Sequence, residues 1–408
     1  MAEAPKDTNG LPTGFQLTPF DPAFQQNPYP ILARLRDAAP MHWDELMHGW
    51  LLTRHDDVRD VLRDKDLWSD PRKAEAESGF RRFVFSGDDE PPMLLLDDPA
   101  HKRLRSLVNK AFTPKAVEAM RPRIAQIAAE LLDAIDADEF DLIASFAAPL
   151  PVIVIAEMLG IDARRRDEFK RLSDLVVNAF FNMMRSEQEA EAAGVAQATL
   201  DGYYIEAIEA RRKKRTADLI SGMVAAENDG DTFTDAEIIS QCNLLLIAGN
   251  VTTTDLIGNG VHALIEHPNE LAKLRGRFEL LENAVEEMLR FDTPVVSSGR
   301  IASRAMEIRG CPAHVGQSMT VSLAGANHDP AVYDHPERFD IERKDSHHQS
   351  FGGGRHFCLG APLARVEAQE GIRALLARFP TLAASSRGHR YRAIPGFRGF
   401  AEYWLTSR

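Results

Sequence analysis

The residues most suggestive of chemistry surround one cysteine, Cys358, in the glycine-rich segment 350–362. Three consecutive glycines at 352–354 allow a turn that residues with a Cβ atom could not make. A helix-forming run follows at 363–378, and Pro362 suits its first turn, where the missing N–H is not needed. Cys358 is therefore expected just ahead of a helix N-terminus, where backbone N–H groups and the helix dipole favour the thiolate over the thiol.

Several kinds of site could use this thiolate. A structural zinc site needs three or four nitrogen or sulfur ligands, and the sequence contains no CxxC pair. A catalytic cysteine needs a partnered base, and His356 lies two residues away. A single thiolate can also be the axial ligand of haem iron. The non-functional alternative is a buried structural cysteine in a glycine-rich loop.

The same segment resembles the ligand signature of the cytochrome P450 haem-thiolate monooxygenases, Phe-x-x-Gly-x-(Arg or His)-x-Cys-x-Gly. The matching residues here are Phe351, Gly354, His356, Cys358 and Gly360. The resemblance covers roughly residues 15–408. It implies haem b as cofactor, Cys358 as the iron ligand, and the other four residues as parts of the haem-binding loop.

The expected fold is mainly α with a smaller antiparallel β region. The resemblance implies the cytochrome P450 fold, a triangular prism crossed by a long central helix. No linker, low-complexity block or repeat interrupts the chain, so a single domain over residues 1–408 is predicted. Its helix-rich part is expected mainly at 100–291 and 361–378, and its β-rich part mainly at 45–55, 300–325 and 388–406.

A long helix is predicted from Thr234 to about His267. The residues Thr234 to Glu237 form a capping box, and Pro268 ends the helix. At ~1.5 Å per residue this helix would span about 50 Å, so its apolar length must lie in the core. Two further helices are predicted upstream at about 100–121 and 122–136, and an apolar one at 141–159.

The middle of the long helix contains poor helix formers, a glycine and three threonines between 248 and 254. Small residues here would let a flat macrocycle approach the backbone. The family segment reads Ala/Gly-Gly-x-(Asp/Glu)-Thr, and Ala248, Gly249 and Thr252 match it. The acid of the family's proton-delivering acid–alcohol pair is missing, because position 251 is valine.

A substitute for that acid can be sought nearby. Asp255 lies four residues after Val251, on the same helix face, and Asn250 offers an amide that could hold water. We expect Thr252 with ordered water to carry the proton relay, assisted by Asp255 or Asn250. The alternative for Asp255 is a salt-bridged or solvated residue.

Four cationic residues are candidates for holding the two haem propionates, whose burial requires such partners. His101 and Arg105 are four residues apart on one predicted helix and match the family's His-x-x-x-Arg element. Arg300 and His356 occupy the other two propionate positions that the resemblance implies. Each could instead belong to an ordinary surface ion pair.

Glu287 and Arg290 match the Glu-x-x-Arg of the family, and Arg338 lies in a Pro-Glu-Arg-Phe segment that also matches. An acid and an arginine three residues apart are common on exposed helices. Together the three resemble a buried ion-pair triad behind the ligand loop, with a role in folding and haem retention.

The expected substrate-pocket residues, by their positions in the family template, are Val295, Val296, Phe400, Phe180 and Phe181. Plain core packing is the alternative for each. No charged residue is placed to bind a carboxylate, so a small to medium, mostly apolar substrate is expected.

Composition excludes several other classes. The net charge of −13 disfavours nucleic acid as a partner. The three cysteines lack regular spacing, which indicates a reducing compartment. Residues 1–26 contain no apolar run, so neither a signal peptide nor a membrane anchor is expected, and we predict a cytoplasmic monomer.

With no fused reductase domain in the sequence, electrons are expected from a separate ferredoxin-type donor. The cations Arg103, Lys110 and Arg355 could meet such an acidic partner, or be solvated surface charges. The predicted function is hydroxylation or a related oxidation with O2. A peroxide-driven or otherwise atypical member of the family is the alternative that Val251 favours, and a haem-based sensor or a cysteine hydrolase are readings from other classes.

Overall fold

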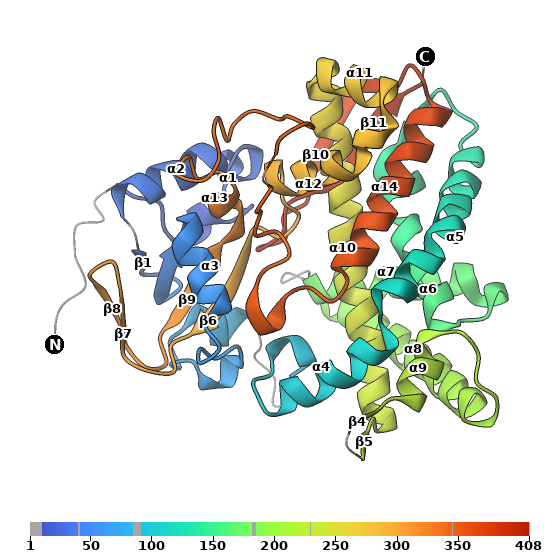
Figure 1. Cartoon of the computed structure of the whole chain (residues 1–408), viewed down its shortest axis with the longest axis horizontal. Coiled ribbons are helices and arrows are strands. Elements are labelled where there is room, and N and C mark those ends of the chain that lie inside the picture. Colours follow the sequence, from blue (N-terminus) through green and yellow to red (C-terminus); the bar gives the residue numbers. More distant parts are fainter. Residues whose placement is uncertain are drawn as a thin grey trace. The chain divides into compact units, whose positions relative to one another are not determined.

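The computed structural model describes residues 10–39, 41–84, 91–181, 185–228, 230–344 and 346–407. These residues divide into two compact units (Figure 1). Unit 1 consists of the described parts of Met1–Asp97, His262–Cys358 and Tyr391–Phe400, and unit 2 of Asp98–Val261, Leu359–Arg390 and Ala401–Arg408. The single domain expected over residues 1–408 stays a prediction.

Unit 1 is built around a four-stranded sheet with the order β1-β2-β9-β6. The pair β2–β9 is parallel, whereas β1–β2 and β6–β9 are antiparallel. The helix that follows β2 packs Val58, Val61 and Leu62 against Leu52 and Val321 of the sheet. This apolar packing holds the C-terminal end of that helix in place. Leu62 at that end lies against Gly354 of the ligand loop.

The elements of unit 1 are the following: η1 (Gly14–Leu17), α1 (Pro22–Gln26), α2 (Tyr29–Ala38), β1 (Met41–Asp44), β2 (Gly49–Leu52), α3 (His55–Arg63), η2 (Pro71–Lys73), η3 (Phe80–Val84), η4 (Met93–Leu95), α11 (Pro268–Gly276), η7 (Phe278–Leu280), α12 (Leu281–Phe291), β6 (Ser297–Ile301), β7 (Met306–Ile308), β8 (Cys311–Ala313), β9 (Ser318–Ser322), α13 (Leu323–Asn327) and η8 (Gly354–His356).

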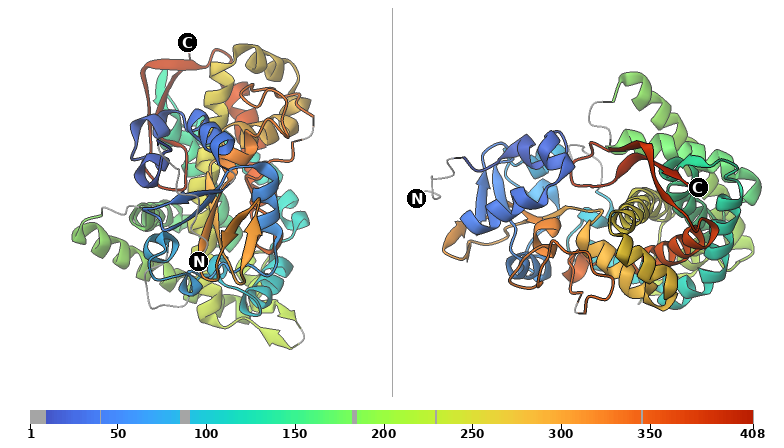
Figure 2. Two further views of the ribbon diagram at one scale, coloured as in Figure 1. Left: turned by 90° about the vertical axis from the view of Figure 1, so that its left-hand side faces the viewer. Right: turned by 90° about the horizontal axis from the view of Figure 1, so that it is seen from above.

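Unit 2 is a helical body in which other helices surround the long helix α10 (Figure 2, right). Its elements are α4 (Ala100–Ala111), α5 (Pro114–Asp133), β3 (Glu139–Asp141), η5 (Ile143–Ala147), α6 (Pro149–Leu159), η6 (Ala163–Arg165), α7 (Arg166–Phe181), α8 (Glu187–Lys213), α9 (Leu219–Ala225), β4 (Glu227–Asn228), β5 (Asp231–Thr232), α10 (Asp235–Glu266, up to Val261), α14 (Ala361–Arg378), β10 (Ala383–Tyr391) and β11 (Phe400–Thr406, from Ala401).

The predicted long helix and its cap are confirmed. The N–H of Glu237 donates to Oγ1 of Thr234 at 3.2 Å, and the N–H of Thr234 donates to Oε2 of Glu237 at 2.8 Å. The helix α10 ends at Glu266, and Pro268 begins α11. The capping box therefore fixed one end and the proline the other.

Two predicted helix boundaries were wrong. The break expected between residues 121 and 122 lies instead at Phe112 and Thr113, because Thr113 caps α5 and Pro114 fills its first turn. Pro122 sits inside α5, on an exposed face. The apolar helix expected at 141–159 is split into η5 and α6, and Pro149 forms the first turn of α6.

None of the described helices is both long enough and apolar enough to cross a bilayer.

Candidate functional site

The ligand loop, residues 350–360, closes on itself through its glycines. Gly352 and Gly354 have φ angles of +68° and +66°, which glycine adopts readily and other residues rarely adopt. A Cβ atom at Gly354 would also overlap the carbonyl oxygen of Leu62 at the end of α3. The N–H of Cys358 donates to the carbonyl of Phe351 at 3.0 Å. The loop therefore presents Cys358 from a closed turn.

Cys358 is half-buried, forms no disulfide with another described residue and lies three residues before α14. Gly360 caps that helix, and Pro362 lies in its first turn, as the sequence predicted. By contrast, Cys242 is fully buried, and burial raises the pKa of its thiol. Of the cysteines in the described chain, Cys358 is thus the one placed to act as a ligand or nucleophile.

Arg300 of β6 is a buried cation without a carboxylate within ion-pair distance among the described residues. Its Nη1 donates to the carbonyl of Gly299 at 2.7 Å, and its Nη2 lies 3.5 Å from the carbonyl of Leu62. Burial, and then the charge of Arg355 in the ligand loop, lower its pKa to about 10. The carboxylate of Asp97 acts in the opposite direction and raises the pKa of Arg300, from beyond ion-pair distance. A buried guanidinium with no carboxylate at ion-pair distance fits a haem propionate.

The middle of α10 carries an open strip of small residues. Ala248 is exposed, and an added Cβ atom at Gly249 would meet no atom within 4 Å. Thr252 is the one residue from Asn250 to Val261 that is not buried, and its hydroxyl donates to the carbonyl of Ala248 at 2.8 Å. Because the strip lies in the centre of a core helix, it fits the face of a flat macrocycle.

The residues expected to replace the missing acid lie elsewhere on α10. Val251 is buried, and so are Asn250 and Asp255. None of the three therefore belongs to the open strip formed by Ala248, Gly249 and Thr252. Their part in a proton relay stays a prediction.

Sequence reasoning missed a buried carboxyl group on α14. Glu367 is 2% exposed and is hydrogen-bonded to Thr253, the neighbour of Thr252 on α10. Burial raises the pKa of Glu367 to about 8, against the opposing effect of the Thr253 hydrogen bond. The sequence held a signal, because Glu367 falls in the apolar stripe of α14 between Leu363 and Gly371.

The four predicted propionate partners divide between the units. His101 and Arg105 share one face of α4 in unit 2, where Nδ1 of His101 lies 3.6 Å from Oδ1 of Asp98. Arg300 and His356 belong to unit 1, and His356 is half-buried in η8. His101 is the buried member of the pair in unit 2, and Arg300 is the buried member of the pair in unit 1.

The ion-pair triad forms with a different third member from the one predicted. Arg290 and Glu287 are fully buried and paired at 2.8 Å and 2.9 Å. Nε of Arg343 lies 3.2 Å from the same carboxylate, whereas the side chain of Arg338 is exposed and lies 3.8 Å from Asp340. Arg338 contributes only its carbonyl, which accepts from Arg290 at 3.1 Å and from Arg343 at 3.0 Å.

The predicted pocket residues have different surroundings. Val295 pairs with Phe397 as an isolated bridge, and the N–H of Val296 donates to the carbonyl of Gly396 at 2.9 Å. Phe400 instead lies in the interior of unit 1, stacked on Tyr391 at 4.6 Å. Phe397, which sequence reasoning missed, therefore lies beside Val295, and the part of Phe400 in a substrate pocket stays a prediction.

Two more predicted residues lie on α7. Phe180 is 61% exposed, and the side chain of Phe181 lies outside the described residues. Among the cations considered for a redox partner, Arg103 is already paired with Asp231 at 2.6 Å and with Glu237. Lys110 is exposed and Arg355 half-buried.

Comparison with known proteins agrees with this geometry. The family model described as Cytochrome P450 matches residues 48–389. Cytochrome P450 107B1 of Saccharopolyspora erythraea is 40% identical over 94% of this chain and 96% of its own length. The 6-deoxyerythronolide B hydroxylase of the same organism is 37% identical over 88% and 91%. The crystal structure of CYP109E1 from Bacillus megaterium with testosterone has a TM-score of 0.85 at 34% identity, covering 94% and 99%.

The ligand loop, the open strip on α10 and these similarities lead to one assignment. The chain belongs to the cytochrome P450 family of haem b-binding oxidoreductases.

Proposed function

We propose that this protein is a haem-thiolate monooxygenase that hydroxylates a small to medium, mostly apolar molecule with O2, with Cys358 as the iron ligand. The observation that carries the proposal is the buried guanidinium of Arg300, which has no carboxylate within ion-pair distance among the described residues. A structural cysteine loop would not need a buried guanidinium of this kind next to it. A bound porphyrin with acidic side chains accounts for both the thiolate and the guanidinium.

Bound haem would supply the redox chemistry that activates O2. The residues of this chain would do the rest. Phe351, Gly354 and Gly360 shape the loop that presents the thiolate of Cys358, and Ala248 and Gly249 leave room beside α10. His101 and Arg105 in unit 2, and Arg300 and His356 in unit 1, would hold the propionates.

Proton supply is the step in which this chain departs from its family, because Val251 carries no acid. Thr252 carries a hydroxyl that is not buried and that donates to the carbonyl of Ala248. Asp255 and Asn250 remain candidates to support it through ordered water. We add Glu367, whose protonated carboxyl contacts Thr253. A proton passed from Glu367 toward Thr252 would be replaced from solvent before the next turnover, so the carboxyl returns to its starting state.

The substrate proposal rests on apolar side chains that lie just before β6 and on the loop paired with that segment. The backbone of Val295 is bridged to Phe397, the backbone of Val296 is hydrogen-bonded to Gly396, and the three side chains carry no charge. Val295 and Val296 are partly buried and pack against two separate apolar clusters of unit 1. Two relatives are named with organic molecules, 6-deoxyerythronolide B as the molecule hydroxylated and testosterone as the bound ligand. A neutral, largely apolar substrate of that general kind suits these side chains best.

We further propose a separate ferredoxin-type donor, a cytoplasmic location and a monomeric state. The exposed Lys110 and the half-buried Arg355 of the ligand loop are the cations that we assign to an acidic donor. Arg103 is less suited, because its guanidinium already holds Asp231 and Glu237 at the start of α10.

The test is the carbon monoxide difference spectrum of the reduced, haem-loaded protein. A thiolate ligand shifts the Soret maximum to long wavelength, and Cys358→Ala should abolish that shift. Cys242→Ala is the matched control, since its thiol is buried and un-ionised at neutral pH. A long-wavelength maximum that survives in Cys358→Ala would refute the assignment.

A peroxide-driven oxygenase is the second candidate, and the buried valine at 251 is the observation that favours it. Such an enzyme receives its protons with the oxidant and needs no acid at that position. Turnover supported by NADH and ferredoxin, compared with turnover supported by hydrogen peroxide on the same substrate, separates the two. Because Thr252 is present and is not buried, we expect turnover with NADH and ferredoxin to be the faster of the two.

A further inference from the structure

The side chain of Arg398 contacts three other parts of unit 1. Its Nε lies 2.6 Å from Oδ1 of Asp292, just after α12, and its Nη1 donates to the carbonyl of Gln25 at the end of α1 at 2.5 Å. Its Nη2 donates to the carbonyl of Gln26 and to the hydroxyl of Tyr391, each at 3.2 Å. We call this set of contacts the Arg398 anchor.

The carboxylate of the anchor is itself held from the N-terminal side. The hydroxyl of Tyr29 on α2 donates to Oδ1 of Asp292 at 2.5 Å, and its ring stacks on His328 at 3.9 Å. The guanidinium of Arg398 also lies 4.5 Å from the centre of the Tyr391 ring. Arg398 and Asp292 are both buried, so this is a desolvated, multiply bonded ion pair.

The backbone next to the anchor carries the proposed substrate contacts. Loop 392–399 is joined to the segment 294–296 by two hydrogen bonds that flank Phe397. The N–H of Arg398 donates to the carbonyl of Pro294 at 2.8 Å, and the N–H of Val296 donates to the carbonyl of Gly396 at 2.9 Å. A displacement of Arg398 would therefore move Phe397, Val295 and Val296 together.

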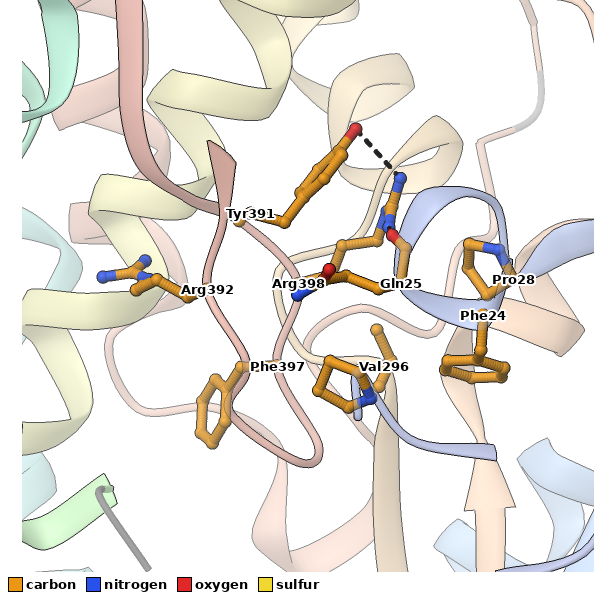
Figure 3. A pocket seen from close by; sticks show the side chains of 10 residues that line it. Phe24, Gln25, Pro28, Val296, Tyr391, Arg392, Phe397 and Arg398 are labelled. Atoms are coloured by element: carbon orange, nitrogen blue, oxygen red, sulfur yellow. Dashed lines mark hydrogen bonds between the residues drawn. The ribbon is translucent and has the colours of Figure 1, made fainter. Parts of the chain in front are cut away.

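A small pocket lies at this junction, lined on its apolar side by Phe24, Pro28, Val296 and Phe397. Figure 3 shows Arg398 directed toward Gln25 and the hydroxyl of Tyr391, whereas Arg392 extends to the other side of the hairpin. The polar groups of Arg398 are thus bonded to protein groups, although the residue also lines the pocket, and Phe397 and Val296 supply part of the pocket's apolar surface.

From this geometry we propose that Arg398 is a positioning residue that sets the shape of the substrate pocket without touching substrate or haem. The inference rests on the proposed function, because it takes Val295, Val296 and Phe397 as substrate contacts. The contacts of the Arg398 anchor hold the loop in one position and do not open and close. Opening them would leave a buried guanidinium and a buried carboxylate unpaired, which is strongly unfavourable.

The experiment uses the ferric, haem-loaded protein and two nitrogenous probes, imidazole and 4-phenylimidazole. Both coordinate iron through the same ring nitrogen, so the ratio of their dissociation constants reports pocket shape and not haem content. We expect Arg398→Met to change this ratio by about fivefold or more, with imidazole binding changed by less than about twofold. Tyr29→Phe, which removes one hydrogen bond to Asp292, should change the ratio in the same direction by less.

Arg390→Met is the matched control, because Arg390 lies on the same hairpin and its one ion pair with a described residue is to Glu402, at 2.9 Å on the surface. An unchanged ratio in Arg398→Met would overturn the proposal. If Arg398→Met does not retain haem, an unchanged ratio in Tyr29→Phe overturns it instead. Failure of the proposed function has a different result, since neither probe would then shift the Soret band of the unmodified protein.

Discussion

The carboxyl group of Glu367 on α14 is hydrogen-bonded to the hydroxyl of Thr253 on α10, and both side chains are 2% exposed. One turn further along each helix, a Cβ atom at Gly371 would lie 3.6 Å from Cδ1 of Ile257. The two helices thus touch at positions four residues apart on both, and this register keeps water away from the carboxyl. Burial without a cation is what raises its pKa.

Glu367→Gln should change the pH dependence of stability. The pKa of Glu367 is about 8 in the folded protein, against the ordinary glutamate pKa of 4.5. Between these values the folded state keeps a proton that the unfolded state has lost. Stability from this group is therefore greatest below about pH 4.5 and falls as pH rises toward 8, by up to roughly 1.4 kcal/mol per unit. Urea unfolding at several pH values should show that the free energy of unfolding of the variant increases, relative to that of the unmodified protein, as pH rises.

The control for that measurement is Glu402→Gln, since Glu402 is a surface carboxylate paired with Arg390. Above about pH 6, the free energy of unfolding of Glu402→Gln should depend on pH in the same way as that of the unmodified protein. Parallel curves for Glu367→Gln and the unmodified protein would contradict a raised pKa at Glu367.

The same substitution tests the proton role. In the unmodified protein, product formed per NADH consumed should fall as pH rises through about 8, because Glu367 then loses its proton. In Glu367→Gln this ratio should be lower at pH 7, by about twofold or more, and independent of pH over the same range. Peroxide-supported turnover should be less affected. A pH profile identical to that of the unmodified enzyme would show that Glu367 supplies no proton.

Val251→Asp should restore the acid of the family's acid–alcohol pair beside Thr252. We expect product per NADH to rise by about twofold or more. Because Val251 is buried, the charge should also reduce stability, and Val251→Asn serves as the uncharged control of similar shape. Equal ratios in the aspartate and asparagine variants would mean that another route already supplies the protons.

Arg300→Met should have opposite effects with and without haem. Without haem, a buried cation whose pKa is lowered to about 10 is removed, so the free energy of unfolding should stay equal or increase. With haem, a propionate partner is lost, and transfer of haem to apomyoglobin should accelerate by about tenfold or more. Arg304→Met is the control, because Arg304 pairs with Asp64 on the surface at 2.6 Å. Unchanged haem transfer would remove Arg300 from the haem site.

Glu287→Gln should destabilise the protein strongly, because Arg290 and Arg343 would lose their shared carboxylate. Breaking a buried pair of this kind costs roughly 3–5 kcal/mol. Arg343→Ala should cost less than Glu287→Gln but clearly more than Arg338→Ala, which removes an exposed side chain and should cost under about 1 kcal/mol. Urea unfolding gives these values, and a larger loss from Arg338→Ala than from Arg343→Ala would contradict the observed pairing.

The sequence by itself determined those features that depend on local rules. The capping box at Thr234 and the proline at 268 delimited α10, because both act within one helical turn. Glycine spacing identified the ligand loop, because positive φ angles and the close approach to Leu62 leave few other residues possible.

Tertiary structure decided the features that depend on which side chains meet across elements. Arg338 and Arg343 are both arginines near the same turn, and only packing shows that Arg343 reaches Glu287. The pKa of Glu367 could not be inferred from its helix alone, since desolvation comes from α10 packed against it. Likewise Phe397 was not among the predicted pocket residues, and only the isolated bridge between Val295 and Phe397 shows that it lies beside one of them.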